Sequence, residues 1–275
     1  MSPPPSTIPR VLAIAGSDSG GGAGIQADLK AFARSGVHGM TAITAITAQN
    51  TVEVRAVEPV SPAMIVAQVQ AVVQDIGVDA VKVGMLGTRE TIAAVAEALE
   101  LLTPATAVVL DPVMVAESGA PLLEPAARDA LVDTIVPRAS VVTPNLQEAA
   151  ALARLPESDP PEALARGVHA LGPEVVVVTG GHREEAIDVY FDGDRLEMLP
   201  GPRFADGASH GSGCTHSSTL AAQLALGASA LEAARTARRV AAEAVGRGLH
   251  QLGGGAGPVA ALALDASSTA PTPLA

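Results

Sequence analysis

The chain has 275 residues, of which 48% are hydrophobic, while only 1% are aromatic and tryptophan is absent. A chain of this length can bury a sizeable core, and here alanine, valine, leucine and isoleucine must build it. The net charge of −12 argues against binding to nucleic acid, which needs a basic surface, and against an anionic membrane surface as a partner.

Cysteine content and the first residues indicate a cytoplasmic protein. The single cysteine, Cys214, excludes an intramolecular disulfide and is typical of reducing compartments. The first residues carry no apolar stretch followed by a cleavage site, and no run of about 18 apolar residues predicts a membrane span. Proline, serine, threonine and alanine dominate residues 1–9 and 263–275, which predicts disordered tails around a single domain of residues 10–262.

Apolar runs and helical patterns alternate along almost the whole chain. The short apolar or threonine-rich runs predict strands at 11–15, 41–47, 52–57, 80–83, 107–110, 140–142 and 175–178. Helices are expected at 25–32, 62–75, 88–101, 124–135, 161–171, 213–226 and 228–248, and one more opens after residue 145. Residues 186–191 and 195–199 predict a β-hairpin. The alternation predicts a layered α/β fold with a central, mostly parallel sheet and helices on both faces.

Polar residues follow the ends of several predicted strands. Gln49, Asp111 and the pair of Asn145 and Glu148 are such residues, and Gly180-Gly181 follows the strand at 175–178. Ligands of parallel α/β sheets bind outside the carboxyl ends of the strands, so the chemistry is expected along this edge. Asp111 and Glu148 supply carboxylate oxygens that, directly or through water, suit Mg²⁺ bridging the phosphates of ATP. For Glu148 alone, the alternative is an exposed helix residue.

Two glycine-rich stretches each lead into a predicted helix. The first, at residues 16–24, lacks the Lys-Ser or Lys-Thr of a nucleotide phosphate loop and better suits close packing against a flat ligand. The second, at 206–219, opens a helix at about Gly213, where backbone N–H groups and the helix dipole favour a phosphate. Cys214 lies in that first turn, which biases its thiol toward thiolate. The alternatives are a simple tight turn and a small buried side chain.

Several motifs occur together and in order: AGSDSGGGAGIQADLKAF, TAQN, VKVGMLG, VVLDPVM, VTPNLQEA, GGH and HGSGCT. With them, residues 10–260 resemble the hydroxymethylpyrimidine/phosphomethylpyrimidine kinases of thiamine biosynthesis, within the ribokinase-like superfamily. The resemblance implies a three-layer ribokinase-like fold. It also implies ATP and Mg²⁺ as cofactors, and phosphorylation of 4-amino-5-hydroxymethyl-2-methylpyrimidine and of its monophosphate.

The resemblance also implies roles for individual residues. It places the pyrimidine pocket at Gly16, Ala23, Asp28, Gln49, Met85 and Val113. It places an anion hole at Gly211 and Gly213, beside a catalytic thiol at Cys214. Metal and phosphate contacts fall on Asp111, Asn145 and Glu148, with Thr179, Gly181 and Ser212 on the nucleotide side.

Residue chemistry supports part of this assignment. The Gln49 amide offers an acceptor and a donor in one plane, which matches the edge of an aminopyrimidine; a strand-end glutamine meeting water is the alternative. The flexible side chain of Met85 can pack against a flat ring; the alternative is that it packs in the core. Asp28 is expected to contact the ring, although a solvated helix face would explain it too. His182 and His210 flank glycines and are interpreted as surface residues.

Three positions depart from the pattern of the family. Glu117 and Thr179 stand where lysines are common, and Ala208 lies in a loop that usually reads K-N-T-H-G-T-G-C. These departures predict fewer basic or polar contacts to phosphate, and they bear most on the second phosphorylation.

Other functions and an assembly state follow from the same residues. A pyridoxal kinase of the same fold and a non-catalytic pyrimidine-binding protein are the main alternatives. A cysteine hydrolase using Cys214 with His210 or His216 would leave the strand-end motifs unexplained. The strands between residues 41 and 57 suggest an exposed sheet edge that needs cover; together with the resemblance, this favours a homodimer.

Overall fold

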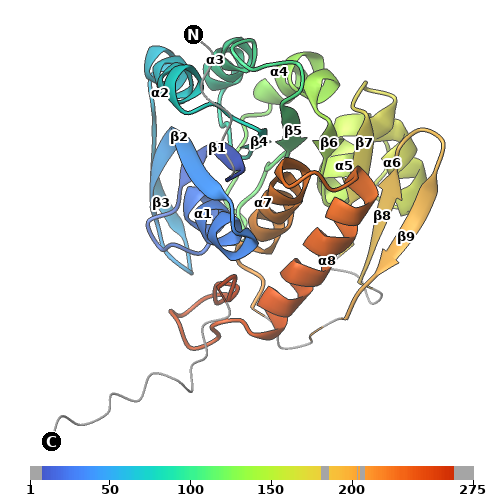
Figure 1. The fold of residues 1–275 in the computed structure, drawn as a ribbon. Helices are drawn as coiled ribbons and strands as arrows, with labels where there is room; N and C mark the ends of the chain where they lie inside the picture. The colour runs from blue at the N-terminus through green and yellow to red at the C-terminus, as the bar shows by residue number, and fades with distance from the viewer. Residues whose placement is uncertain (1–7, 181–185, 203, 205–207, 263–275) are drawn as a thin grey trace, which may run out of the picture.

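A nine-stranded sheet forms the centre of the molecule (Figure 1). The computed structural model describes residues 8–180, 186–202, 204 and 208–262. The strand order is β3-β2-β1-β4-β5-β6-β7-β8-β9. The strands are β1 (Arg10–Ser17), β2 (His38–Gln49), β3 (Val54–Pro59), β4 (Ala80–Val83), β5 (Ala107–Leu110), β6 (Val141–Val142), β7 (Val175–Val178), β8 (Ile187–Phe191) and β9 (Leu196–Pro200).

The middle of the sheet is parallel and its edges are antiparallel. Strands β2, β1, β4, β5, β6 and β7 run parallel, while β3 pairs antiparallel with β2, and β8 with β7 and β9. The central strands are nearly continuous apolar runs, because helices cover both of their faces. The carboxyl ends of six strands therefore meet along one edge of the sheet.

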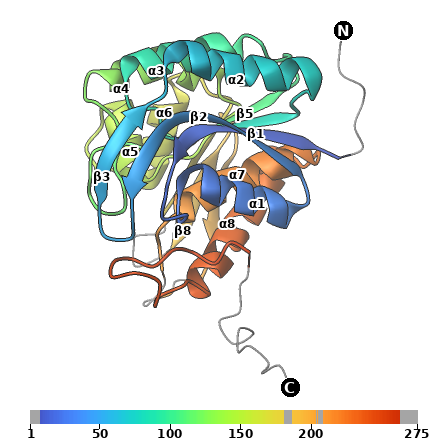
Figure 2. The ribbon, with the colours of Figure 1, turned by 90° about the vertical axis from the view of Figure 1, so that its left-hand side faces the viewer.

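Helices form a layer on each face, as Figure 2 shows. One face carries α2 (Pro62–Asp75), α3 (Arg89–Leu99), α4 (Ala127–Thr134), α5 (Leu146–Ala153) and α6 (Pro161–His169). The other carries α1 (Gly24–Ser35), α7 (Ser212–Ala225) and α8 (Ala230–Gly246). Strand alternation divides the core accordingly, because Leu12 and Ile14 pack into one layer while Val11 and Ala13 pack into the other. The predicted three-layer fold is confirmed.

The predicted elements are present with small shifts at their ends. The strand expected from residue 52 begins at Val54, the helix expected from 124 begins at Ala127, and the predicted hairpin is formed by β8 and β9. Residues 1–7 and 263–275 lie outside the described residues, so the predicted tails and domain limits stay predictions. Within the described ranges, no helix is long and apolar enough to cross a membrane.

Candidate active site

A cavity of about 720 Å³ lies at the carboxyl ends of the parallel strands. Its wall contains residues at or just after the carboxyl ends of β1, β2, β4, β5, β6 and β7, together with the start of α7. The predicted site residues that line it are Gly16, Ala23, Gln49, Met85, Asp111, Val113, Asn145, Glu148, Thr179, Gly211, Ser212, Gly213 and Cys214. Gly181 and His182 lie outside the described residues. Strand-end residues that are far apart in sequence thus share one cavity, along the edge of the sheet where the chemistry is expected.

The side of the cavity near β1 and β2 suits a flat ring. A Cβ atom added at Gly16 would lie 3.1 Å from the Met85 sulfur, so glycine allows the methionine to pack against the backbone. Thr47 Oγ1 donates a hydrogen bond of 3.2 Å to Gln49 Oε1. Ser19 Oγ bonds both the backbone carbonyl and the backbone N–H of Gln49, at 2.7 and 2.8 Å. The Ser19 bonds fix the backbone of Gln49 at the rim, while the Thr47 hydroxyl near its side-chain amide also reaches the carbonyl of Ser17, at 2.8 Å.

The opposite side is the N-terminus of α7. Gly211 is its N-cap, with a left-handed φ of 84°, a conformation that favours glycine. The N–H of Ser212 turns back to the carbonyl of Ser209 at 2.9 Å, and the first turn exposes the positive end of the helix dipole toward the cavity. This arrangement suits an anion, as predicted from the glycines.

The protonation state of Cys214 differs from the prediction. Burial raises the pKa of this thiol to about 12, helped by the negative charges of Asp111 and Asp28, whereas Lys82 and the N–H of Gly24 act in the opposite direction. The predicted bias toward thiolate is therefore wrong for the free protein. The position of Cys214 at the helix start does not decide its charge, because burial of the thiol outweighs the effects that favour thiolate.

A buried ion-pair cluster lies beneath the cavity and was not predicted. Lys82, on β4, is fully buried, with its Nζ 2.9 Å from Asp28 Oδ1 and 3.6 Å from Asp111 Oδ2. Burial alone would lower the pKa of Lys82, but Asp28, Cys214 and Asp111 together raise it, so the ammonium is charged. Hydroxyls complete the cluster, since Ser218 donates to Asp28 at 2.7 Å and Ser217 to Asp111 at 3.0 Å.

This cluster corrects the interpretation of Asp28. Its side chain is fully buried, it does not line the cavity, and Lys82 and Ser218 occupy Oδ1. Asp28 therefore lies under the site and supports it, instead of facing the ring. A lysine within the apolar run of Ala80-Val81-Lys82-Val83 was the signal that could have revealed a buried pair.

The expected metal residues follow β5 and β6. Glu148 closes a capping box on α5, since its Oε2 accepts from the N–H of Asn145 at 2.9 Å and Asn145 Oδ1 accepts from the N–H of Glu148 at 2.9 Å. Burial, followed by the charge of Asp111, raises the pKa of Glu148 to about 8. Two neighbouring carboxylates that repel each other fit a cation. Among the described residues no cluster of three acidic, histidine or cysteine ligands could hold a metal, so phosphate and water oxygens would complete the shell.

The departures from the family pattern also have places in the structure. Glu117 is exposed at the rim and accepts a hydrogen bond of 2.5 Å from Ser209, just before the anion loop. Thr179 lines the cavity, and the side chain of Ala208 is buried. In the part of the chain that the structure describes, the cationic side chains of the wall are Lys82 and Arg238, and both face carboxylates.

Two histidines of the wall were placed wrongly or left without a role. His210, interpreted as a surface residue, is buried with its Nε2 3.0 Å from Asp18 Oδ2. His216 is also buried, 3.2 Å from Asp188, whose other oxygen lies 3.7 Å from Arg238. The sequence around each histidine does not reveal the buried carboxylate that it contacts in the fold.

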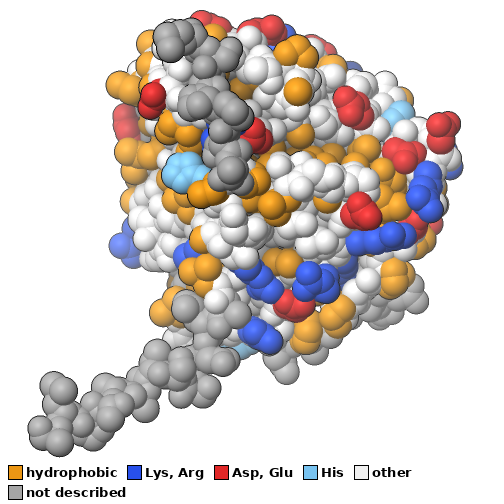
Figure 3. All heavy atoms as spheres, viewed as in Figure 1, with side chains coloured by type: hydrophobic (Ala, Val, Ile, Leu, Met, Phe, Trp, Pro, Cys, Tyr) orange, Lys and Arg blue, Asp and Glu red, His pale blue; other side chains and the backbone are white. Residues whose placement is uncertain are grey.

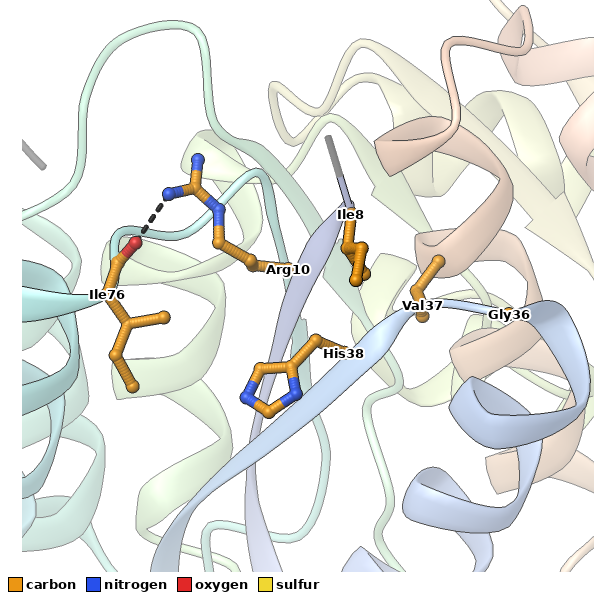
Figure 4. A pocket seen from close by; sticks show the side chains of 6 residues that line it. All are labelled: Ile8, Arg10, Gly36, Val37, His38 and Ile76. Carbon is orange, nitrogen blue, oxygen red and sulfur yellow. Dashed lines mark hydrogen bonds between the residues drawn. The ribbon is translucent and has the colours of Figure 1, made fainter. Parts of the chain in front are cut away.

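A second cavity, of about 360 Å³, lies at the opposite edge of the sheet (Figure 4). Its wall comes from the starts of β1 and β2 and the ends of α1 and α2. Arg10 hydrogen-bonds the carbonyl of Ile76 there and pairs with Asp79 at 2.7 Å. With its cation already paired and the strand carboxyl ends far away, this cavity is not the candidate site.

Comparisons with known proteins agree with the geometry. A family model described as phosphomethylpyrimidine kinase matches residues 18–260. The hydroxymethylpyrimidine/phosphomethylpyrimidine kinase of Rhizobium meliloti (strain 1021) is 48% identical over 254 residues, which cover 90% of this chain and 95% of that protein.

Two solved structures share the fold. Pyridoxal kinase from Staphylococcus aureus in complex with AMP-PCP and pyridoxal superposes with a TM-score of 0.84 at 35% identity, covering 94% of this chain and 95% of that one. Phosphomethylpyrimidine kinase from Clostridium difficile 630 gives a TM-score of 0.73 at 38% identity, covering 84% and 96%. On the match to the family model and the identity to its relatives, this chain belongs to the phosphomethylpyrimidine kinase family.

Proposed function

We propose that the protein transfers the γ-phosphoryl group of ATP to the hydroxymethyl oxygen of 4-amino-5-hydroxymethyl-2-methylpyrimidine, and then phosphorylates the monophosphate, in thiamine biosynthesis. One observation carries the proposal. A single cavity joins a flat, glycine-lined side that ends at Gln49 to a helix N-terminus that holds Cys214. The family match supports the same substrate class.

In this proposal the chain supplies alignment and charge stabilisation, which phosphoryl transfer requires more than strong base chemistry. Gln49, with Gly16, Ala23, Met85 and Val113, holds the ring. The N–H groups of Gly211 and Gly213 stabilise the transferring group, as in an anion hole. Cys214 lies beside them, and its thiolate form would accept the proton of the attacking hydroxyl.

The nucleotide side is proposed to use Asn145, Ser212, Thr179 and Gly181. Asp111 and Glu148 would hold Mg²⁺, which supplies charge neutralisation to the phosphates of ATP when bound. The repulsion between these two neighbouring carboxylates, which a cation would relieve, and the pairing of both cations that the described wall contains support this part.

In the deciding experiment the purified protein is incubated with MgATP and with hydroxymethylpyrimidine, its monophosphate or pyridoxal. The products are then identified by mass. The proposal expects phosphate transfer to hydroxymethylpyrimidine and to its monophosphate, in preference to pyridoxal. Preferred turnover of pyridoxal would make the protein a pyridoxal kinase. Pyrimidine binding without any turnover would make it a binding protein.

Replacing Gln49 with leucine is expected to weaken pyrimidine binding while nucleotide binding and fold persist. The substitution removes a paired polar contact and strands the polar edge of the ligand, which costs about 1–3 kcal/mol. Titration of the pyrimidine by calorimetry measures the loss. An unchanged affinity would remove Gln49 from the site.

We further propose a cytoplasmic homodimer. The edge strand β3 is exposed along most of its length, and Ile46 and Val57 on β2 and β3 are 56% and 41% exposed. Such an edge is commonly covered by a second chain. Light scattering at micromolar concentration should give twice the monomer mass; the monomer mass would contradict this assembly.

On the face drawn in Figure 3, basic side chains near α8 are interspersed with acidic ones, which does not suit nucleic acid.

A further inference from the structure

Asp18 and His210 form a buried contact to which the mechanism above gives no role. They are 2% and 6% exposed and 192 positions apart in the chain, yet Nε2 of His210 lies 3.0 Å from Oδ2 of Asp18. A carboxylate only accepts hydrogen bonds, so the imidazole N–H is the donor. Both side chains line the cavity.

Asp18 organises the loop that leads into α1. Its Oδ1 accepts from the N–H of Gly20 at 2.8 Å, and its Oδ2 accepts from the N–H groups of Gly22 and Ala23 at 3.0 and 2.8 Å. Burial alone would raise the pKa of Asp18, but the hydrogen bonds from His210, Ala23 and Gly20 hold it below its usual range. The carboxylate is therefore charged and fixes the backbone of the ring-side loop.

His210 belongs to the other side of the cavity. It immediately precedes Gly211, the N-cap of α7, and its own carbonyl accepts from the N–H of Val259 at 3.0 Å. The two loops also touch directly. A Cβ atom on Gly22 would lie 2.1 Å from the His210 ring, and one on Gly211 would lie 1.8 Å from the carbonyl oxygen of Gly22.

We infer that Asp18 and His210 are a positioning pair, which fixes the Gly211–Gly213 anion loop at the correct place relative to the ring-binding loop. The inference rests on the proposed role of the anion loop. In-line transfer depends on this placement, and a misplacement of about 1 Å is enough to cost about 100-fold in rate. The pair touches no reacting atom and acts through the two backbones that it joins.

The experiment compares three variants at His210. His210→Gln keeps an N–H donor at about the position of Nε2 and is expected to retain kcat within about 3-fold, whereas His210→Leu removes the donor and should lower kcat about 10–100-fold. His210→Asn, whose amide is one methylene too short, should behave like leucine and serves if the leucine variant does not fold. The separate dissociation constants of ATP and of the pyrimidine should stay within about 3-fold of those of the unmodified protein.

Two controls separate positioning from simple stability. Asp79→Asn removes a carboxylate that likewise binds a side chain and a backbone N–H, at the far edge of the sheet, and should lower Tm without lowering kcat. The double variant of Asp18→Asn and His210→Leu should lose less kcat than the product of the two single losses, because both substitutions remove the same contact. Two results would overturn the inference. One is an unchanged kcat in both His210→Leu and His210→Asn, and the other is a fall in the kcat of His210→Gln as large as that of His210→Leu. If the unmodified protein transfers no phosphate to the pyrimidine, the proposed function itself fails; if the unmodified protein is active and His210→Leu and His210→Asn keep its kcat, only the positioning pair fails.

Discussion

Replacing Cys214 with alanine is expected to lower kcat by about 10²–10⁴-fold, the usual contribution of a general base. The substitution removes the only thiol but keeps the N–H groups of the α7 N-terminus. Binding of ATP and pyrimidine should change little, because their main proposed contacts lie elsewhere in the cavity. Steady-state kinetics with separate binding titrations measures both effects.

The pH dependence makes the test of Cys214 sharper. With the thiol pKa raised to about 12, the thiolate fraction of the free enzyme grows about tenfold per pH unit through the neutral range. We expect kcat/KM of the unmodified enzyme to rise with pH between about 6 and 9, and the alanine variant to lose that slope. Alkylation of Cys214 should accelerate in the same way, and bound pyrimidine should protect the thiol.

Control variants decide between the thiol and its surroundings. Cys214→Ser should not restore the rate, because a hydroxyl is a much poorer proton acceptor, while Cys214→Asp is expected to restore part of it. If Cys214 only packs the helix start, alanine will alter thermal stability and leave kcat unchanged. That result would leave the anion loop and the metal as the whole mechanism.

Replacing Lys82 with methionine is expected to produce the largest loss of stability. The substitution leaves Asp28 and Asp111 buried without their cation, and breaking a buried ion pair on one side costs about 3–5 kcal/mol. For a chain of this size the midpoint of thermal unfolding should fall by about 6–20 °C. Activity should fall with it, because Asp111 and Cys214 both lie against the cluster.

A double variant serves as the matched control for Lys82. Lys82→Met combined with Asp28→Asn removes the uncompensated charge together with its partner, so it should be more stable than Lys82→Met alone. Calorimetry of the three proteins measures the coupling. Equal stability of the single and double variants would show that Lys82 does not neutralise Asp28.

The fold was predictable because its signals are local. The four valines of β7 and the alternation of β1 with α1 identify elements from neighbouring residues alone. The cavity followed from one rule, that strand carboxyl ends share an edge, which brought Gln49, Asp111 and Asn145 together. Element ends shifted by a few residues, since helix and strand termini depend on capping and pairing.

The electrostatics of the site could not be predicted in the same way. Lys82 meets Asp28 across 54 residues, and His210 meets Asp18 across 192. Ionisable side chains are expected on the surface until such a partner is known. The protonation of Cys214 was mispredicted for the same reason, because burial of its thiol by other parts of the fold cannot be seen in the sequence of α7.

The place of α7 in the chain has a consequence for biosynthesis. This helix and α8 cover one face of the sheet against Val11, Ala13, Val109 and other strand residues, but both are translated after all nine strands. Domains emerge from the ribosome with the N-terminus first. A nascent chain that ends before residue 212 thus presents an uncovered apolar face, which is a surface that chaperones bind. That face can be covered, and the anion loop can form, only after the last quarter of the chain has been made. Catalytic competence is therefore acquired late in synthesis.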